Sequence, residues 1–350
     1  MIDVRRLRLL RDLDRLGTLA AVAEAHTCTP SAVSQQLAAL QREAGVRLLE
    51  RSGRGVALTP AGVALVGHAE TVLAALEAAS ATLAAARAGL GGTVRIGAFP
   101  TAVHTLLPAA LVALGRDHPG LDLSVTELDP AAVPEALRER RLDVALLHDY
   151  DLAPVEPDPA LDSTPLLDET VFLAVPGGEG AEPPADAEGG GSPGVATAAD
   201  AEEGERSADP VDSADPVDPV DSADFADPVD PVAGFRDADW IVATPGTLCH
   251  TVAVQACRAA GFAPRIRHRV DDFTAVLTLV AAGQGVALVP RLGAERPPDG
   301  VRLLPLPVRR RTRIAYRRGA GGHPAVAACV RAIRAATRAH LAAGEAWRAG

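Results

Sequence analysis

The N-terminal fold of this chain is set by residues 18–60, which read TLAAVAEAHTCTPSAVSQQLAALQREAGVRLLERSGRGVALTP. Two helix starts in this stretch carry the same dipeptide, Thr29-Pro30 and Thr59-Pro60. In each pair the threonine hydroxyl can cap free backbone N–H groups, and proline suits the first helical position. After the first pair, apolar residues at i, i+4 and i+7 predict a buried helix stripe. These residues are Val33, Leu37 and Leu40. The pattern predicts a winged helix-turn-helix.

A second face of the helix after Pro30 is small and polar, because serine and glutamine recur there at i, i+3 and i+4. A glycine-containing loop with several arginines follows, where the wing is expected. A polar helix face beside a basic loop suits a DNA major groove flanked by phosphates. The residues that we expect to contact double-stranded DNA are Thr29, Pro30, Ser31, Ser34, Gln35, Arg51 and Arg54.

The net charge of −11 is unusual for a DNA-binding protein until it is divided by segment. Residues 1–60 hold nine arginines and six acidic residues, whereas residues 177–233 hold 16 acidic residues and one arginine. In the acidic segment SADPVD occurs at 207–212 and again at 213–218. Dense charge and proline with few aromatic residues cannot bury enough surface to fold. We therefore expect a disordered insert, either a tolerated surface loop or a docking segment for a partner.

The length of the chain, its apolar runs, its cysteines and its motifs also narrow the class of protein. The 350 residues are enough for two or three domains. We expect no apolar run of the roughly 18 residues that span a membrane, and the N-terminus lacks a signal-peptide core, so we expect a cytoplasmic protein. The four cysteines form no CxxC pair and no zinc spacing. Nucleophile motifs, phosphate-binding glycine loops, metal clusters and acid–base pairs are not apparent, so we expect neither an enzyme nor a cofactor.

Residues 60–90 are alanine-rich and contain few helix breakers. Apolar residues there fit the a and d positions of a heptad repeat. They are Val66, Ala69, Leu73, Leu76 and Leu83. A helix of this length is marginal alone, so we expect it to dimerise; packing on its own chain is the alternative. From residue 93 onward, strands and helices alternate at short spacing, which predicts an α/β domain with parallel strands. The pattern predicts a helix over 101–118 and separate strands near 301–306 and 313–317.

Together these features resemble the LysR-type transcriptional regulators. The resemblance is carried by Ala23-Glu24, TPSAVSQQL at 29–37, Leu40, Gly45-Val46, LLER at 48–51, LTPAG at 58–62 and VAAGQGVALVP at 280–290. It covers nearly the whole chain outside the insert. The family implies that Gln35 meets bases in the major groove. Arginine is often found at this position, and glutamine reads adenine where arginine prefers guanine.

The resemblance also implies a domain organisation. A winged helix-turn-helix would span 1–59, and a linker helix that dimerises would span 60–90. A periplasmic-binding-protein-like effector domain would follow, with one α/β lobe at 92–163 and 308–342. The second lobe, at 164–307, would contain the acidic insert. The family further implies dimers that often pair into tetramers on DNA, and promoter output modulated by a small-molecule effector bound between the lobes.

In this fold a ligand is expected at strand C-terminal ends and helix N-termini. Phe99, Pro100 and Thr101 follow the first strand and open a helix, so their surroundings could hold an anion. Asp129 and His148 follow the next strands. By family analogy Thr247 faces the other lobe. Ordinary capping and turn roles are the alternative for each of these residues.

Cys249 and Cys257 raise a different possibility, because peroxide-sensing members of this family carry two cysteines in a similar region. Eight residues apart on one helix, they would be about 12 Å apart, whereas a disulfide needs Cα atoms within about 7 Å. Arg258 is their only basic neighbour in sequence. A thiol redox sensor is therefore one alternative to ligand control, and a DNA-binding regulator without ligand control is another.

Overall fold

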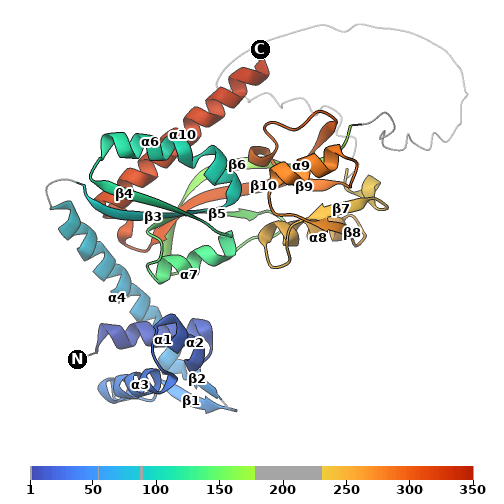
Figure 1. Ribbon diagram of the computed structural model, residues 1–350. Coiled ribbons are helices and arrows are strands. Elements are labelled where there is room, and N and C mark those ends of the chain that lie inside the picture. The colour runs from blue at the N-terminus through green and yellow to red at the C-terminus, as the bar shows by residue number, and fades with distance from the viewer. Residues whose placement is uncertain (1, 54, 87–89, 178–230, 350) are drawn as a thin grey trace, which may run out of the picture.

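The computed structural model describes residues 2–53, 55–86, 90–177 and 231–349 (Figure 1). Its N-terminal part is a helical module followed by a hairpin. The elements are α1 (Val4–Leu16), α2 (Leu19–Ala25), α3 (Pro30–Ala44), β1 (Leu49–Ser52) and β2 (Gly55–Leu58). As predicted, Thr29 caps α3 by accepting from the Ala32 N–H, and Pro30 is the first helical residue. The stripe of Val33, Leu37 and Leu40 is buried against α1 and α2.

Helix α4 (Pro60–Ala85) joins this module to the rest of the chain (Figure 1). Thr59 caps it by accepting from the Gly62 N–H. The predicted heptad residues do not share one environment: Ala69 and Leu73 are buried within the chain, whereas Leu76 and Leu83 are exposed. The helix therefore packs on its own chain with one face and leaves an apolar stripe on another.

The expectation of no membrane-length apolar run needs correction at α4. This helix is long and apolar enough to cross a membrane by length and composition, with a mean hydropathy of 1.3. The value reflects its many alanines, and a single such helix is weak grounds for a membrane span. Its charged residues also pair within the chain: Glu77 contacts Arg140, and Glu70 lies 3.8 Å from Arg11.

The described residues from 92 onward are built on a six-stranded sheet with the order β4-β3-β5-β10-β6-β9. Its strands are β3 (Gly92–Ala98), β4 (Leu121–Glu127), β5 (Val144–Tyr150), β6 (Leu161–Pro176), β9 (Ala287–Pro290) and β10 (Val301–Arg317). Strands β3, β4 and β5 are parallel, as expected, but β10 runs antiparallel to both β5 and β6. The prediction of parallel strands therefore holds for β3, β4 and β5, and the sheet is mixed because β10 and β9 run antiparallel to the strands they pair with.

Helices cover both faces of the sheet in each lobe. In lobe I, α5 (Pro100–Thr105), α6 (Leu107–Asp117) and α10 (Pro324–Ala349) pack on one face of β3 and β5, and α7 (Val133–Arg138) packs on the other. In lobe II, α8 (Leu248–Ala259) and α9 (Phe273–Ala281) cover opposite faces of β6. Strand β7 (Asp239–Val242) pairs with β8 (Arg265–Arg269) and touches Val286 through a single bridge. The long strands β6 and β10 belong to both lobes.

Two other predicted elements differ from the structure. The helix expected over 101–118 is two helices, α5 and α6, which meet at Leu106 and Leu107 just before Pro108. Proline lacks the N–H that a continuous helix would need at this point. The separate strands expected near 301–306 and 313–317 are a single strand, β10, with a register shift between Pro305 and Arg309. Most of the acidic insert, residues 178–230, lies outside the described residues.

Candidate ligand cleft and nucleic-acid interface

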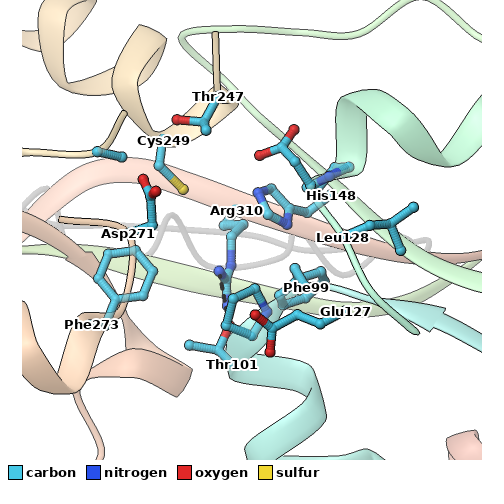
Figure 2. A pocket seen from close by; sticks show the side chains of 14 residues that line it. Phe99, Thr101, Glu127, Leu128, His148, Thr247, Cys249, Asp271, Phe273 and Arg310 are labelled. Atoms are coloured by element: carbon cyan, nitrogen blue, oxygen red, sulfur yellow. Dashed lines mark hydrogen bonds between the residues drawn. The ribbon is translucent and has the colours of Figure 1, made fainter. Parts of the chain in front are cut away.

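A cavity of about 210 Å³ lies where the two lobes meet (Figure 2). The six residues predicted for the effector site all line it: Phe99, Pro100, Thr101, Asp129, His148 and Thr247. Five of them follow β3, β4 or β7, whereas His148, which was expected just after a strand, lies within β5 (Val144–Tyr150) near its C-terminal end. Their meeting reflects the shared C-terminal edge of strands in an open α/β sheet. The structure brings them together; whether they bind an effector stays a prediction.

Sequence reasoning missed several lining residues, of which Arg310 is the most central. Figure 2 shows its guanidinium in the middle of the cavity wall, with Asp271 and Phe273 on one side and His148 on the other. The strand pattern contained the necessary clue. Positions 306, 308, 310, 312 and 314 of β10 are all buried, so Arg310 is in phase with apolar residues. Asp271 follows β8 as Asp129 follows β4, and the same rule would have found it.

The positive charge of Arg310 is balanced by an ion pair inside the protein. Its Nε lies 2.7 Å from Oε1 of Glu169, and both side chains are about 1% exposed. The guanidinium also stacks over the Phe99 ring at 4.9 Å. Burial, the largest single influence, lowers the pKa of Arg310, but the Glu169 carboxylate together with Tyr150 and Cys249 raises it, and the net effect is a raised pKa. Arg310 is therefore charged, with its countercharge already in contact.

His148 is buried but lacks hydrogen-bond partners. Its ring meets Phe99 at 4.6 Å and Tyr150 at 5.3 Å, both edge to face. Neither ring nitrogen has a partner among the described residues, although the residue is only 3% exposed. Burial, with a smaller contribution from Arg310, holds the pKa of His148 well below its usual value. The ring is therefore neutral and offers one donor and one acceptor.

The other charged groups at the cavity are carboxylates: Glu127, Asp129 and Asp271. Asp129 accepts from the Ala131 N–H at 2.9 Å, and Asp271 accepts from the N–H and hydroxyl of Thr244 at 2.7 and 2.8 Å. Burial raises the pKa of Asp129, and the negative charge of Asp271 raises it further. These charges disfavour the anion that was expected near Thr101, and the short helix α5 (Pro100–Thr105) adds little to attract one.

Thr247 and the cysteines meet at the start of α8. The Thr247 hydroxyl accepts from the His250 N–H and donates to the Thr244 carbonyl, so it acts as a helix cap. Cys249 lies at the cavity with its Sγ 3.4 Å from the Tyr150 hydroxyl, and burial raises the pKa of its thiol. Cys257 lies on the same helix, which is the arrangement considered for the pair in the sequence, and it is fully buried.

The predicted DNA-contact residues lie on the outer surface of the N-terminal module. Thr29, Pro30, Ser31, Ser34 and Gln35 are exposed on the first two turns of α3, and Arg51 is exposed on β1. Figure 1 places α3 and the β1–β2 hairpin at the end of the molecule farthest from the six-stranded sheet. Arg54 lies outside the described residues. The arrangement leaves this face open, and its contact with bases stays a prediction.

Two family models match this chain. The model described as "Bacterial regulatory helix-turn-helix protein, lysR family" matches residues 4–63. The model described as "LysR substrate binding domain" matches residues 87–188 and 211–338. Together the two matches span most of the chain, in the order of the two parts of the structure.

Individual proteins agree with these matches. A probable hydrogen peroxide-inducible genes activator of Mycobacterium xenopi is 40% identical over 158 residues, which are 45% of this chain and 81% of that protein. The DNA-binding transcriptional dual regulator OxyR of Escherichia coli (strain K12) is 27% identical over 344 residues, or 95% of this chain and 97% of OxyR. The structure of a Corynebacterium glutamicum OxyR mutant has a TM-score of 0.51 at 22% identity, covering 99% of this chain and 95% of its own. That structural similarity concerns the fold.

Proposed function

This chain belongs to the LysR family of bacterial transcriptional regulators, and we propose that a small molecule held in its interlobe cleft controls its output at promoters. The observation that carries the proposal is the cleft itself. It draws side chains from both lobes to one cavity, and it contains a neutral buried histidine whose ring nitrogens have no hydrogen-bond partner within the described part of the chain. Buried polar groups are normally hydrogen-bonded, so His148 is prepared for a polar group of a ligand.

The proposal assigns a role to each part of the chain. We place the DNA-binding domain at 1–59, the linker helix at 60–90, lobe I at 92–163 and 308–342, and lobe II at 164–307. Lobe II carries the acidic insert, for which a surface loop is the simplest role. In this proposal the protein binds double-stranded DNA in the cytoplasm and has no catalytic activity.

Dimerisation is proposed through the exposed face of α4. Val72, Leu76 and Leu83 project from one side of this helix, at i, i+4 and i+11. Their exposure ranges from 39% to 69%, which is high for large apolar side chains. A second copy of the helix would cover them in the manner of a coiled coil. Paired dimers would form the tetramers that the family resemblance implied.

Ligand binding can reach DNA through the contact between lobe I and α4. A ligand held between Asp129 in lobe I and Asp271 in lobe II would favour one spacing of the lobes. Lobe I packs on α4 at η4 (Ala320–Gly322), and Glu77 of α4 contacts Arg140 and Arg317 of lobe I. A change in the spacing of the lobes can therefore be transmitted directly to α4, the helix that carries the DNA-binding domain.

The test compares ligand response with operator binding. A metabolite panel should raise the melting temperature of the full chain for at least one compound, and that compound should alter transcription from the target promoter. His148→Leu removes both ring nitrogens while keeping an apolar side chain of moderate size. It should abolish the response and leave operator binding intact. A panel without any response, or an unchanged response in the variant, would favour a regulator without ligand control at this cleft.

Peroxide sensing is the second candidate, favoured by the names of relatives such as the Mycobacterium xenopi protein. Two features of this chain oppose it. The reactive form of cysteine is the thiolate, and burial raises the pKa of the Cys249 thiol. Cys257 is fully buried on the same helix, so a disulfide would require α8 to unwind. Hydrogen peroxide should leave operator binding unchanged; a response lost in Cys249→Ser would instead establish thiol sensing.

A further inference from the structure

We infer that the effector of this cleft carries a positively charged amine, whose ammonium group lies between Asp129 of lobe I and Asp271 of lobe II. The inference rests on the proposed function, because it names the chemical class of ligand for the same cavity. It replaces the anion that was expected from the residues after the first strand.

The charge balance of the lining is the first argument. Three carboxylates and one guanidinium line the cavity. The guanidinium of Arg310 is already neutralised by Glu169, which lies behind the wall and is itself buried. The charge that remains for a ligand is therefore negative. An anion would meet like charges in a partly desolvated space, where Coulomb energies are larger than in water.

The position of the two aspartates also favours a cation. Asp129 is held by the backbone at the start of η1 (Pro130–Ala132), and Asp271 is held by Thr244 after β7. Both side chains are thus oriented by their own lobe. Each carboxylate still has lone pairs beyond these contacts. The negative charge of Asp271 acts on Asp129 across the cleft and raises its pKa, and a cation placed between them would remove this repulsion.

His148 supplies an independent observation. Its ring nitrogens are buried and have no partner among the residues that the structure describes, and the neutral ring does not repel a cation. The acceptor nitrogen of the His148 ring can accept a hydrogen bond from a hydroxyl, amide or amine group of a ligand. The rings of Phe99 and Phe273 also line the cavity, so the body attached to the amine is expected to be apolar or aromatic.

Three fragments of nearly equal shape separate charge from size: benzylammonium, benzyl alcohol and benzoate. Each is titrated into the full chain at neutral pH by calorimetry and ligand-observed NMR. Benzylammonium should bind most tightly, and its affinity should fall about tenfold in Asp129→Asn and in Asp271→Asn. Asparagine keeps an oxygen for the Ala131 and Thr244 contacts, so both variants should fold. Asp299→Asn, at an exposed site away from the cavity, is the matched control and should bind like the native chain.

The outcomes distinguish this inference from the proposed function. Preference for benzoate, equal binding of benzyl alcohol and benzylammonium, or benzylammonium binding that is unchanged in both aspartate variants would overturn the amine assignment and leave the ligand cleft standing. If none of the three fragments binds, the amine assignment fails as well, and the metabolite panel and His148→Leu decide separately whether the cleft is a ligand site.

Discussion

Arg310 and Glu169 face each other in register on the antiparallel strands β10 and β6, and their side chains form an ion pair that is about 99% buried. The second carboxylate oxygen of Glu169 accepts from the Leu292 N–H at 2.7 Å. The pair therefore links the two long strands to η3 (Arg291–Gly293) next to the ligand cleft. The ion pair holds the cavity wall in place and neutralises the guanidinium among the described lining residues.

Breaking this pair should destabilise the protein strongly. Glu169→Gln leaves the Arg310 guanidinium buried without its countercharge, which costs about 3–5 kcal/mol in free energy of unfolding. Asp168→Asn is the matched control, because it breaks the exposed Arg309–Asp168 pair on the same two strands and should cost less than about 1 kcal/mol. Urea denaturation measures both. Equal effects of the two variants would show that burial of the Arg310–Glu169 pair has no energetic consequence.

DNA recognition should divide between α3 and the wing. Gln35→Ala should cost about 1–3 kcal/mol on the operator and little on random DNA, because a lost base contact affects only specific binding. Arg51→Ala should weaken binding to both DNAs and reduce the salt slope by about one, as expected for a phosphate contact. Fluorescence anisotropy at several salt concentrations gives both quantities. Binding that is unaltered by both substitutions would refute these assignments.

The contact between lobe I and α4 should be sensitive at Gly319. A Cβ atom there would lie 2.3 Å from the Ala74 carbonyl oxygen, and the residue has φ +84°. Gly319→Ala should therefore destabilise this contact by more than about 1 kcal/mol and increase hydrogen exchange in α4. At Gly322 a Cβ would meet Ala81 only at 3.9 Å, so Gly322→Ala is the control and should change little. Equal hydrogen exchange of α4 in the two variants would argue against a tight contact between lobe I and α4.

Dimerisation should depend on one face of α4. Leu76→Asp places a charge in the exposed apolar stripe and should dissociate the dimer, as measured by analytical ultracentrifugation. Val63 is 56% exposed on the opposite side of the same helix. Val63→Asp should leave the assembly unchanged. A dimer that survives Leu76→Asp would place the interface elsewhere.

The amine ligand should bind less tightly in acid. The pKa of Asp129 is raised by burial and by Asp271, so Asp129 gains a proton at a higher pH than an ordinary aspartate. Protonation removes the charge that holds the ammonium group, and benzylammonium affinity should fall as pH decreases through the raised pKa. Asp271 and Glu127 also face the cavity, and Asp129→Asn should reduce the loss of affinity that acid causes. An identical pH profile in the variant would exclude Asp129 as the titrating group.

Local chemistry allowed much of this structure to be predicted. The starts of α3 and α4 depend on a threonine, a proline and N–H groups within four residues, so the sequence contains all the partners. The six cleft residues were predictable for a related reason. Five of them follow strands and His148 lies near the end of β5, and the ends of neighbouring strands gather at one edge of a sheet.

The sequence by itself therefore determined the helix starts, the winged helix-turn-helix and the residues at the strand ends. Only the tertiary structure decided the direction of β10, the packed face of α4 and the charge that the cleft presents. Arg310 reads as a cation in the sequence, yet Glu169, 141 residues earlier, neutralises it. The reason is physical: electrostatic and packing energies depend on neighbours in space, and those neighbours exist only once distant strands have paired.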